Sequence, residues 1–205
     1  MSVHKKSAPA KKPGRPSRRP QIVAAAEKLL RTRGLSHATT KAIAAAAGCS
    51  EAALYVHFKG RSDLLLAVLQ ESLPDLLVPL RALKEAVGKS TPRDNLLRAL
   101  LAVFAFHQRV TPSVCALFAE PELLTEYRRS LNEQGKGPHG AIAHLRKYIA
   151  AEQKIGRINR NVDAETAAAS LMANSFFRAF TGHFFGGQQS TEPHFKKLVA
   201  EIIPD

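Results

Sequence analysis

The chain has few cysteines, no long apolar run and few acidic residues in its first third, and each shortage excludes a class of protein. Cys49 and Cys115 are the only cysteines among 205 residues and lie far apart, so neither a disulfide framework nor a thiolate zinc site is expected. No unbroken apolar run is long enough to span a bilayer, and no apolar segment follows the N-terminal charges as it would in a secretory signal. We therefore expect a cytoplasmic protein that does not associate with a membrane.

Acidic residues are scarce only at the N-terminal end. Residues 1–62 contain 13 Lys or Arg and two acids, Glu27 and Glu51, whereas residues 63–205 contain 17 Lys or Arg and 15 acids. Most of the net charge of +13 therefore lies in the first third of the chain. A basic module on a nearly neutral body favours an anionic partner for that module alone, although a solvated tail that aids solubility would carry the same excess.

Hydrophobic residues make up 45% of the chain and recur at helical spacing, without a convincing strand or βαβ pattern. We expect Pro74 and Pro79 to kink or end the helix in which they lie, because proline lacks the backbone donor. The pattern predicts helices at approximately 21–33, 40–47, 51–57, 61 onward, 92–109, 112 onward, 121–133, 139–153, 164–185 and 191–203. The sequence thus predicts an all-α protein.

The first three helices have the spacing of a helix-turn-helix. Thr39 and Ser50 stand at N-cap positions, and Gly48 suits a tight turn with positive φ between the second and third helices. Leu54 and Phe58 would pack the short third helix onto the first two. Such a unit is what a major-groove reader needs, although an ordinary helical hairpin can carry the same turn. We divide the chain into a disordered basic arm (1–19), a helix-turn-helix domain (20–62) and a helical-bundle body (63–205).

The run from Thr39 to Phe58 contains the blocks Ile-Ala-x-x-Ala-Gly-x-Ser and Leu-Tyr-x-His-Phe, and it closely resembles the DNA-binding segment of TetR-family transcriptional regulators. The resemblance covers about residues 20–69. It implies a homodimeric, sequence-specific DNA-binding regulator, most simply a repressor that a small apolar or amphipathic ligand releases from a palindromic operator. It also implies an all-helical body that binds the ligand and dimerises.

The resemblance assigns roles within the helix-turn-helix. Thr39 would reach a phosphate, Tyr55 and His57 would contact phosphates, and Arg61 takes the position where the family usually has lysine. The expected DNA-binding residues in this segment are Thr39, Thr40, Lys41, Ser50, Glu51, Ala52, Ala53, Tyr55, His57 and Arg61. Because alanines at the base-facing start of the third helix cannot donate hydrogen bonds, thymine methyl contacts and DNA shape are expected to contribute to specificity. The alternative for the two aromatic residues is packing in a small core.

The basic arm contains a Gly-Arg-Pro core and is similar to the AT-hook type of minor-groove arm. Arg15 would enter the narrow groove of A·T tracts, and Arg18 and Arg19 would add contacts. The alternative is nonspecific attraction to phosphates. In either case the arm should make binding steeply dependent on salt.

In the body, the resemblance implies dimerisation through the last two helices and a ligand pocket among the middle ones. The small and apolar residues expected at the dimer interface are Ala168, Leu171, Met172, Ser175, Phe195, Leu198, Val199 and Ile202. The aromatic residues and histidine expected to line the pocket are Phe104, His107, Phe118, Tyr127, Phe176 and Phe180. Both sets could instead belong to the intramolecular core.

No enzymatic constellation stands out. His139 and His144 are five residues apart with no carboxylate between them, and Cys115 lies eight residues after His107. We expect neither an enzyme nor a cofactor or metal site. The stronger rival to the regulator is a DNA-architectural protein that binds A·T-rich DNA through the arm without a ligand switch.

Overall fold

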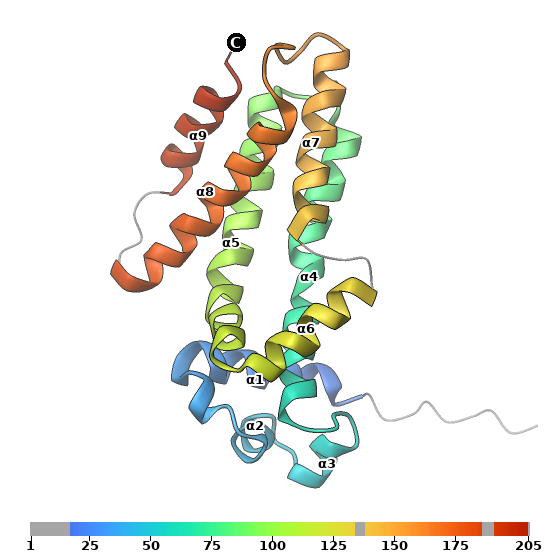
Figure 1. Ribbon diagram of the computed structural model, residues 1–205, viewed down its shortest axis with the longest axis vertical. Coiled ribbons are helices and arrows are strands. Elements are labelled where there is room, and N and C mark those ends of the chain that lie inside the picture. The colour runs from blue at the N-terminus through green and yellow to red at the C-terminus, as the bar shows by residue number, and fades with distance from the viewer. Residues whose placement is uncertain (1–16, 134–137, 186–190, 205) are drawn as a thin grey trace, which may run out of the picture.

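The computed structural model describes residues 17–133, 138–185 and 191–204, and within these ranges the chain forms helices without strands (Figure 1). The all-α prediction is thereby confirmed. The elements in chain order are α1 (Arg19–Arg33), the 3-10 turn η1 (Leu35–His37), α2 (Thr40–Ala46), α3 (Glu51–Tyr55), α4 (Arg61–Ala86), α5 (Pro92–Ala119), α6 (Pro121–Glu133), α7 (Pro138–Lys154), α8 (Ala164–Phe185) and α9 (Thr191–Ile202).

The helices form a small head and a long body. Helices α1 to α3 make the head, at the lower end of the molecule in Figure 1. Helix α4 runs from the head along the body with α5 and α7 beside it, α8 runs obliquely and packs on α5 and α7, and α6 crosses the body close to the head. Helix α5 is central, since it contacts α4, α8 and α9 and also reaches α1.

Side-chain caps, a glycine turn and two buried side chains determine the local structure of the head. The Oγ1 atom of Thr39 accepts a hydrogen bond from the Ala42 amide at 3.2 Å, and the Oγ of Ser50 accepts one from the Ala53 amide at 3.1 Å. Gly48 has a φ of 65°, in the left-handed region that glycine adopts without strain. Leu54 and Phe58 are buried. The predicted caps, turn and packing residues of the helix-turn-helix are confirmed.

Helix α4 continues through both of its prolines, so neither of them ends it early. An internal proline costs about 3 kcal/mol, because a backbone hydrogen bond is lost and the ring crowds the preceding turn. The leucines on the inward face of this helix are buried, and each burial contributes about 1.5–3 kcal/mol. Those that flank the two prolines are Leu69, Leu76, Leu80 and Leu83. Tertiary packing therefore outweighs the local penalty.

Helix α5 is likewise a single helix of 28 residues, so the predicted break between residues 109 and 112 is wrong. Pro112 lies between the buried Thr111 and Ser113, and the Thr111 hydroxyl donates to the His107 carbonyl at 2.6 Å. By length and composition helix α5 is the one helix among the described residues that could cross a membrane, although Arg98 and Arg109 interrupt its apolar sequence. Its central place in the body accounts for the apolarity, because half of its most apolar segment is buried there.

Helix α1 begins inside the segment that the sequence analysis assigned to the basic arm. Helix α1 already includes Arg19, and Arg18 is its N-cap residue. Both residues are therefore part of the folded head rather than of a disordered arm ending at residue 19. Arg15 lies outside the described residues.

Candidate nucleic-acid interface and internal cavity

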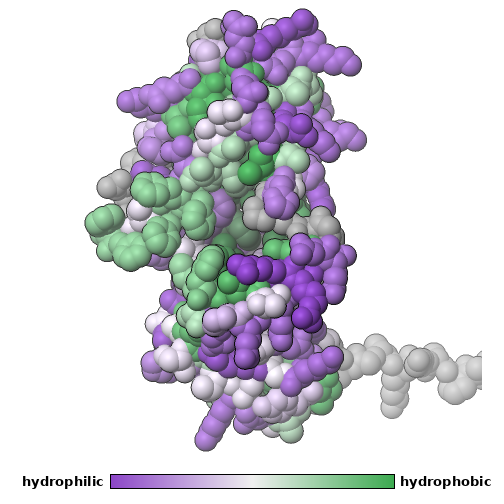
Figure 2. All heavy atoms as spheres, in the orientation of Figure 1, coloured by the Kyte–Doolittle hydropathy of each residue, from purple (hydrophilic) through white to green (hydrophobic). Residues whose placement is uncertain are grey.

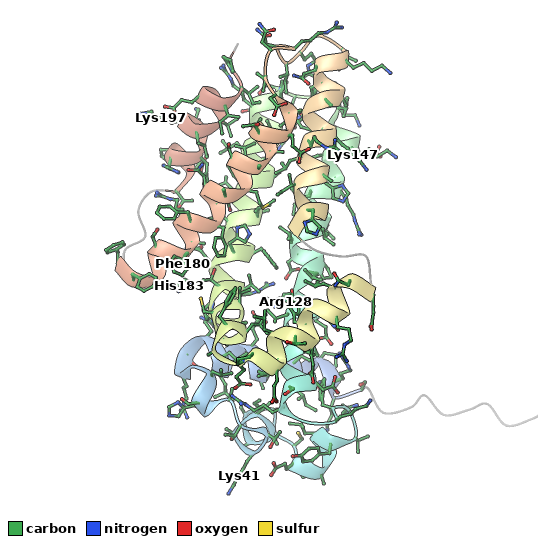
Figure 3. All side chains as sticks on the ribbon, in the orientation of Figure 1. Lys41, Arg128, Lys147, Phe180, His183 and Lys197 are labelled. Carbon is green, nitrogen blue, oxygen red and sulfur yellow. The ribbon has the colours of Figure 1, made fainter. Side chains whose placement is uncertain are left out.

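Helices α2 and α3 expose one face at the end of the molecule farthest from the body. Thr39, Lys41, Ser50 and Ala52 are exposed, and Tyr55 is 51% exposed. Lys41 points away from the body at this end of the molecule (Figure 3). The face combines a cation, hydroxyl groups and a small apolar surface on a short helix, which suits contact with an anionic polymer.

Glu51 is turned toward α2 rather than fully toward solvent. The Thr40 hydroxyl donates to the Glu51 Oε1 at 2.5 Å, and both residues are half-buried. The contact ties the start of α3 to the start of α2, and the carboxylate also lies favourably near the positive end of the α3 dipole. Of the three residues expected to face the bases, Ala52 is exposed, whereas Glu51 and Ala53 are half-buried.

The aromatic pair after the turn is not part of the core. Tyr55 is exposed, and the half-buried His57 meets Phe58 edge to face with 6.5 Å between ring centroids. Beside them, Val56 is 79% exposed and was missed by the sequence analysis. The sequence analysis extended this helix to residue 57, whereas α3 ends at Tyr55, so Val56 leaves the helical register that the prediction assumed.

Arg61, for which the resemblance implies a phosphate contact, is engaged within the chain. Its Nε donates to the Ala38 carbonyl at 3.1 Å and its Nη2 to the Leu35 carbonyl at 2.8 Å. Its Nη1 forms an ion pair with Glu120 at 2.8 Å. All three guanidinium nitrogens thus join the loop before α2 to the junction between α5 and α6.

The two arginines at the start of α1 are also engaged, contrary to their expected role in a minor-groove arm. Arg18 donates from Nη1 to the Gly48 carbonyl at 2.9 Å, in the turn between α2 and α3. Arg19 pairs with Glu71, and its guanidinium lies over the Phe58 ring at 5.0 Å from the centroid. These contacts join the start of α1 to the turn after α2, to the residue Phe58 and to α4.

A cavity of about 740 Å³ lies in the body between α4, α5, α6, α7 and α8. Its lining is mostly aliphatic. Three residues predicted for a pocket line it, namely His107, Tyr127 and Phe176. The side chains that line the cavity are Leu69, Leu73, Leu76, Leu77, Arg81, Phe106, His107, Val110, Val114, Tyr127, Leu131, Gly140, Ala141, Ile142, His144, Ala169, Met172, Ala173 and Phe176.

The other three aromatic residues predicted for the pocket lie elsewhere. Phe104 packs edge to face on Phe195 of α9, with ring centroids 5.4 Å apart. Phe118 is 69% exposed near the end of α5. Phe180 stacks on Phe176 from outside the cavity lining, with centroids 6.2 Å apart. Helical spacing placed these rings on the correct helices but on other faces.

The polar groups of the cavity lining are Arg81, His107, Tyr127 and His144, and no acidic residue is among them. The Nδ1 of His107 lies 3.0 Å from the Ser175 Oγ, and burial lowers the pKa of His107 to about 4. Burial raises the pKa of Tyr127, so its hydroxyl stays protonated. The pKa of His144 is lowered, first by burial and then by the nearby positive charges of Arg81 and Lys147.

Most residues predicted for the dimer interface are buried within one chain, which corrects that prediction. Ala168, Leu171, Met172 and Ser175 face the interior from α8, and Phe195 and Val199 do so from α9. Leu198 and Ile202 are partly buried against the same core.

The exposed apolar surface of α8 is instead aromatic. Phe177, Phe184 and Phe185 are 66%, 70% and 82% exposed. Figure 2 shows hydrophobic residues gathered where the end of α8 projects from the body. Among the described residues no group of three or more His, Cys, Asp or Glu side chains could hold a metal ion.

Residues 22–68 match the family model described as "Bacterial regulatory proteins, tetR family". The chain is 25% identical over 153 residues to the HTH-type transcriptional regulator BetI of Brucella anthropi, which covers 73% of this chain and 77% of that protein.

Solved structures share the fold over nearly the whole length. The fatty acid degradation regulator FadR from Bacillus halodurans superposes with a TM-score of 0.69 at 17% identity, covering 94% of this chain and 97% of that one. FadR from Bacillus subtilis, solved in complex with stearoyl-CoA, gives a TM-score of 0.65 at 16% identity, covering 90% and 97%. These relatives and neighbours are regulators rather than enzymes, in agreement with the expectation of a non-enzymatic protein.

Proposed function

Because the chain is a TetR-family transcriptional regulator, we propose that it binds a palindromic operator as a homodimer and leaves it when a small apolar or amphipathic ligand enters the body cavity. The observation that carries this proposal is the pairing, in one chain, of an exposed helix-turn-helix with an apolar cavity of about 740 Å³. Helix α4 belongs to both, since it begins beside the head and lines the cavity. We place the division between the two parts near residue 62, in the first turn of this helix, and the protein in the cytoplasm.

On DNA, we assign the phosphate contacts to the exposed polar groups around the turn. Thr39 and Lys41 lie at the start of α2, and Ser50, Tyr55 and the half-buried His57 lie at the two ends of the short α3. The remaining exposed residue at the start of that helix, Ala52, offers a methyl group and no hydrogen-bond donor. Readout of thymine methyl groups and of DNA shape follows from that chemistry.

For the dimer, we assign the interface to the exposed aromatic face of α8. Phe177 and Phe184 are seven residues apart and therefore lie on one side of the helix. Burying a phenylalanine side chain contributes about 1.5–3 kcal/mol, which favours association of two such faces about a twofold axis. A Phe177→Glu variant should be monomeric by sedimentation velocity at concentrations where the native chain is dimeric. A dimeric variant would contradict this assignment.

For transmission of the signal, we assign a route from the cavity through α6 to the head. Tyr127 and Leu131 of α6 line the cavity, and Glu120 immediately precedes that helix. The ion pair between Glu120 and Arg61 continues through Arg61 to the loop carbonyls just before Thr39. A ligand that displaces α6 therefore changes the support of α2, and a shift of a few Å between two heads is enough to lower affinity for two half-sites about one helical turn apart.

The proposal is tested by the DNA that the purified full chain retrieves from a library of short genomic duplexes at moderate salt. We expect enrichment of one palindrome, retrieved equally well by a Lys147→Gln control, whose altered side chain points away from the body far from the head (Figure 3). A Tyr55→Ala variant should retrieve the palindrome weakly. Broad recovery of A·T-rich fragments without a shared palindrome would contradict the proposal and favour the architectural protein.

A further inference from the structure

One cation of the cavity lining has no acidic partner. Arg81 belongs to α4, four residues after Leu77, so the two side chains lie on the same side of that helix, and both contribute to the cavity. Among the described residues, no hydrogen bond or ion pair engages Arg81, whereas Arg61, Arg109 and Arg157 each pair with an acid. Arg81 is exposed, so it stands where the cavity meets solvent.

His144 lies beside Arg81 on the neighbouring helix. It belongs to α7, which contacts α4, and it lines the same cavity three residues after Ala141. The positive charge of Arg81 is one of the causes that lower the pKa of His144, which requires the two groups to be close. Together they offer a guanidinium fork and an imidazole at one edge of an otherwise apolar space.

The rest of the lining offers no second place for a charge. His107 is neutral and already contacts Ser175, and Tyr127 keeps its hydroxyl proton. No acid of the lining could receive a cation. An anion, by contrast, can accept charge-assisted hydrogen bonds from Arg81. The apolar part of the same ligand can then pack against the aliphatic side chains of the cavity.

We propose that the cavity binds a monoanionic amphiphile, an alkyl or aryl carboxylate whose carboxylate is held by Arg81 and His144 while its tail extends toward His107 and Phe176. Arg81 is then the residue that selects anions over neutral molecules of the same shape. That this cavity is the regulatory site rests on the proposed function, whereas the chemistry of the ligand rests on its lining.

The test compares octanoate, octan-1-ol and octylammonium, which share a tail and differ in charge, by calorimetric titration of the full chain without DNA. We expect octanoate to bind about tenfold or more tightly than octan-1-ol, as one charge-assisted hydrogen bond would give, and octylammonium not to bind. Arg81→Gln should weaken octanoate about tenfold and leave octan-1-ol unchanged, and His144→Gln should weaken octanoate less. Lys154→Gln, a charge loss ten residues after His144 on the same helix and outside the lining, should bind as the native chain does.

Equal affinities for octanoate and octan-1-ol, an unchanged octanoate affinity in Arg81→Gln, or binding of none of the probes would overturn the proposal. Because Arg81 is exposed, the variant should keep the native circular dichroism spectrum. The proposed function fails separately. If octanoate binds through Arg81 but leaves DNA affinity unchanged, ligand-driven release is refuted. The assignment of Arg81 as the residue that binds the carboxylate would still hold.

Discussion

Replacing Arg61 by lysine keeps the charge but removes the guanidinium group, whose contacts join the head to the body. Lysine carries a single ammonium group, so it can replace about one of the three contacts made to Leu35, Ala38 and Glu120. A hydrogen bond to a charged group contributes about 1.5–3 kcal/mol, and the 34% exposure of the Arg61 side chain lowers this to about 1 kcal/mol each. We expect Arg61→Lys to lower the free energy of unfolding by about 2 kcal/mol.

The assay is urea unfolding of the DNA-free protein, followed by circular dichroism at one fixed protein concentration, because the stability of the proposed dimer would depend on concentration. In a thermal scan, the same loss corresponds to a fall in Tm of about 4–8 °C for a chain of this size. The matched control is Arg31→Lys in α1, because Arg31 is exposed and engages no other described residue through a hydrogen bond or ion pair. This control should unfold as the native chain does.

A small loss of stability would contradict this reasoning about Arg61. If Arg61→Lys unfolded within about 0.5 kcal/mol of the native chain, as ordinary surface substitutions do, the link between head and body would contribute little. A loss of operator affinity in that same variant would then indicate a bidentate phosphate contact. The reasoning above requires the stability loss to appear without any DNA present.

Three further outcomes follow from single residues. Lys41→Gln should lower DNA affinity uniformly across sequences and reduce the slope of log K against log salt by about 1, measured by fluorescence anisotropy; an unchanged slope would remove Lys41 from the interface. The fully buried carboxylate of Glu152 lies 3.5 Å from Arg157, so Glu152→Gln should cost about 2–4 kcal/mol in urea unfolding, and a loss below about 1 kcal/mol would contradict that role. Burial lowers the folded-state pKa of His107 from 6.5 to about 4, so the unfolded chain takes up this proton at higher pH than the folded chain does. The stability that comes from the neutral buried imidazole is therefore complete above about pH 6.5 and is lost as pH falls toward 4. Between pH 7 and pH 4 the native chain should lose about 3 kcal/mol more than His107→Gln does, and parallel stability curves would refute the buried neutral imidazole.

The head could be predicted from sequence because its signals are local. A cap such as Thr39 or Ser50 acts on an amide three residues away, and the turn at Gly48 depends on one backbone angle. The partners of Arg61 lie 23 to 59 residues away, and those of Arg18 and Arg19 lie 30 to 52 residues away. No local pattern shows whether such an arginine contacts DNA or a carbonyl within its own chain.

The packing of the body was harder to predict, because apolar periodicity shows which face of a helix is buried but not which helix covers that face. Helix α8 is apolar on several sides, so the stripe containing Leu171 and Ser175 could pack within the chain or on a second copy, and it packs within the chain. The exposed Phe177 and Phe184 lie on another side of the same helix. The sequence could have placed Arg81 in the cavity lining, because Leu73, Leu77 and Arg81 recur at intervals of four along one side of α4.

The most direct test of the account is dimethyl sulfate probing of the selected DNA fragment with the full chain bound. The reagent methylates guanine N7 in the major groove and adenine N3 in the minor groove, and so reports which groove the protein occupies. If α3 of two chains binds as proposed, guanines will be protected in two half-sites related by a twofold axis, with centres about one helical turn or a multiple apart. Protection confined to adenines along an A·T tract, without twofold symmetry, would contradict the account and assign binding to the basic arm.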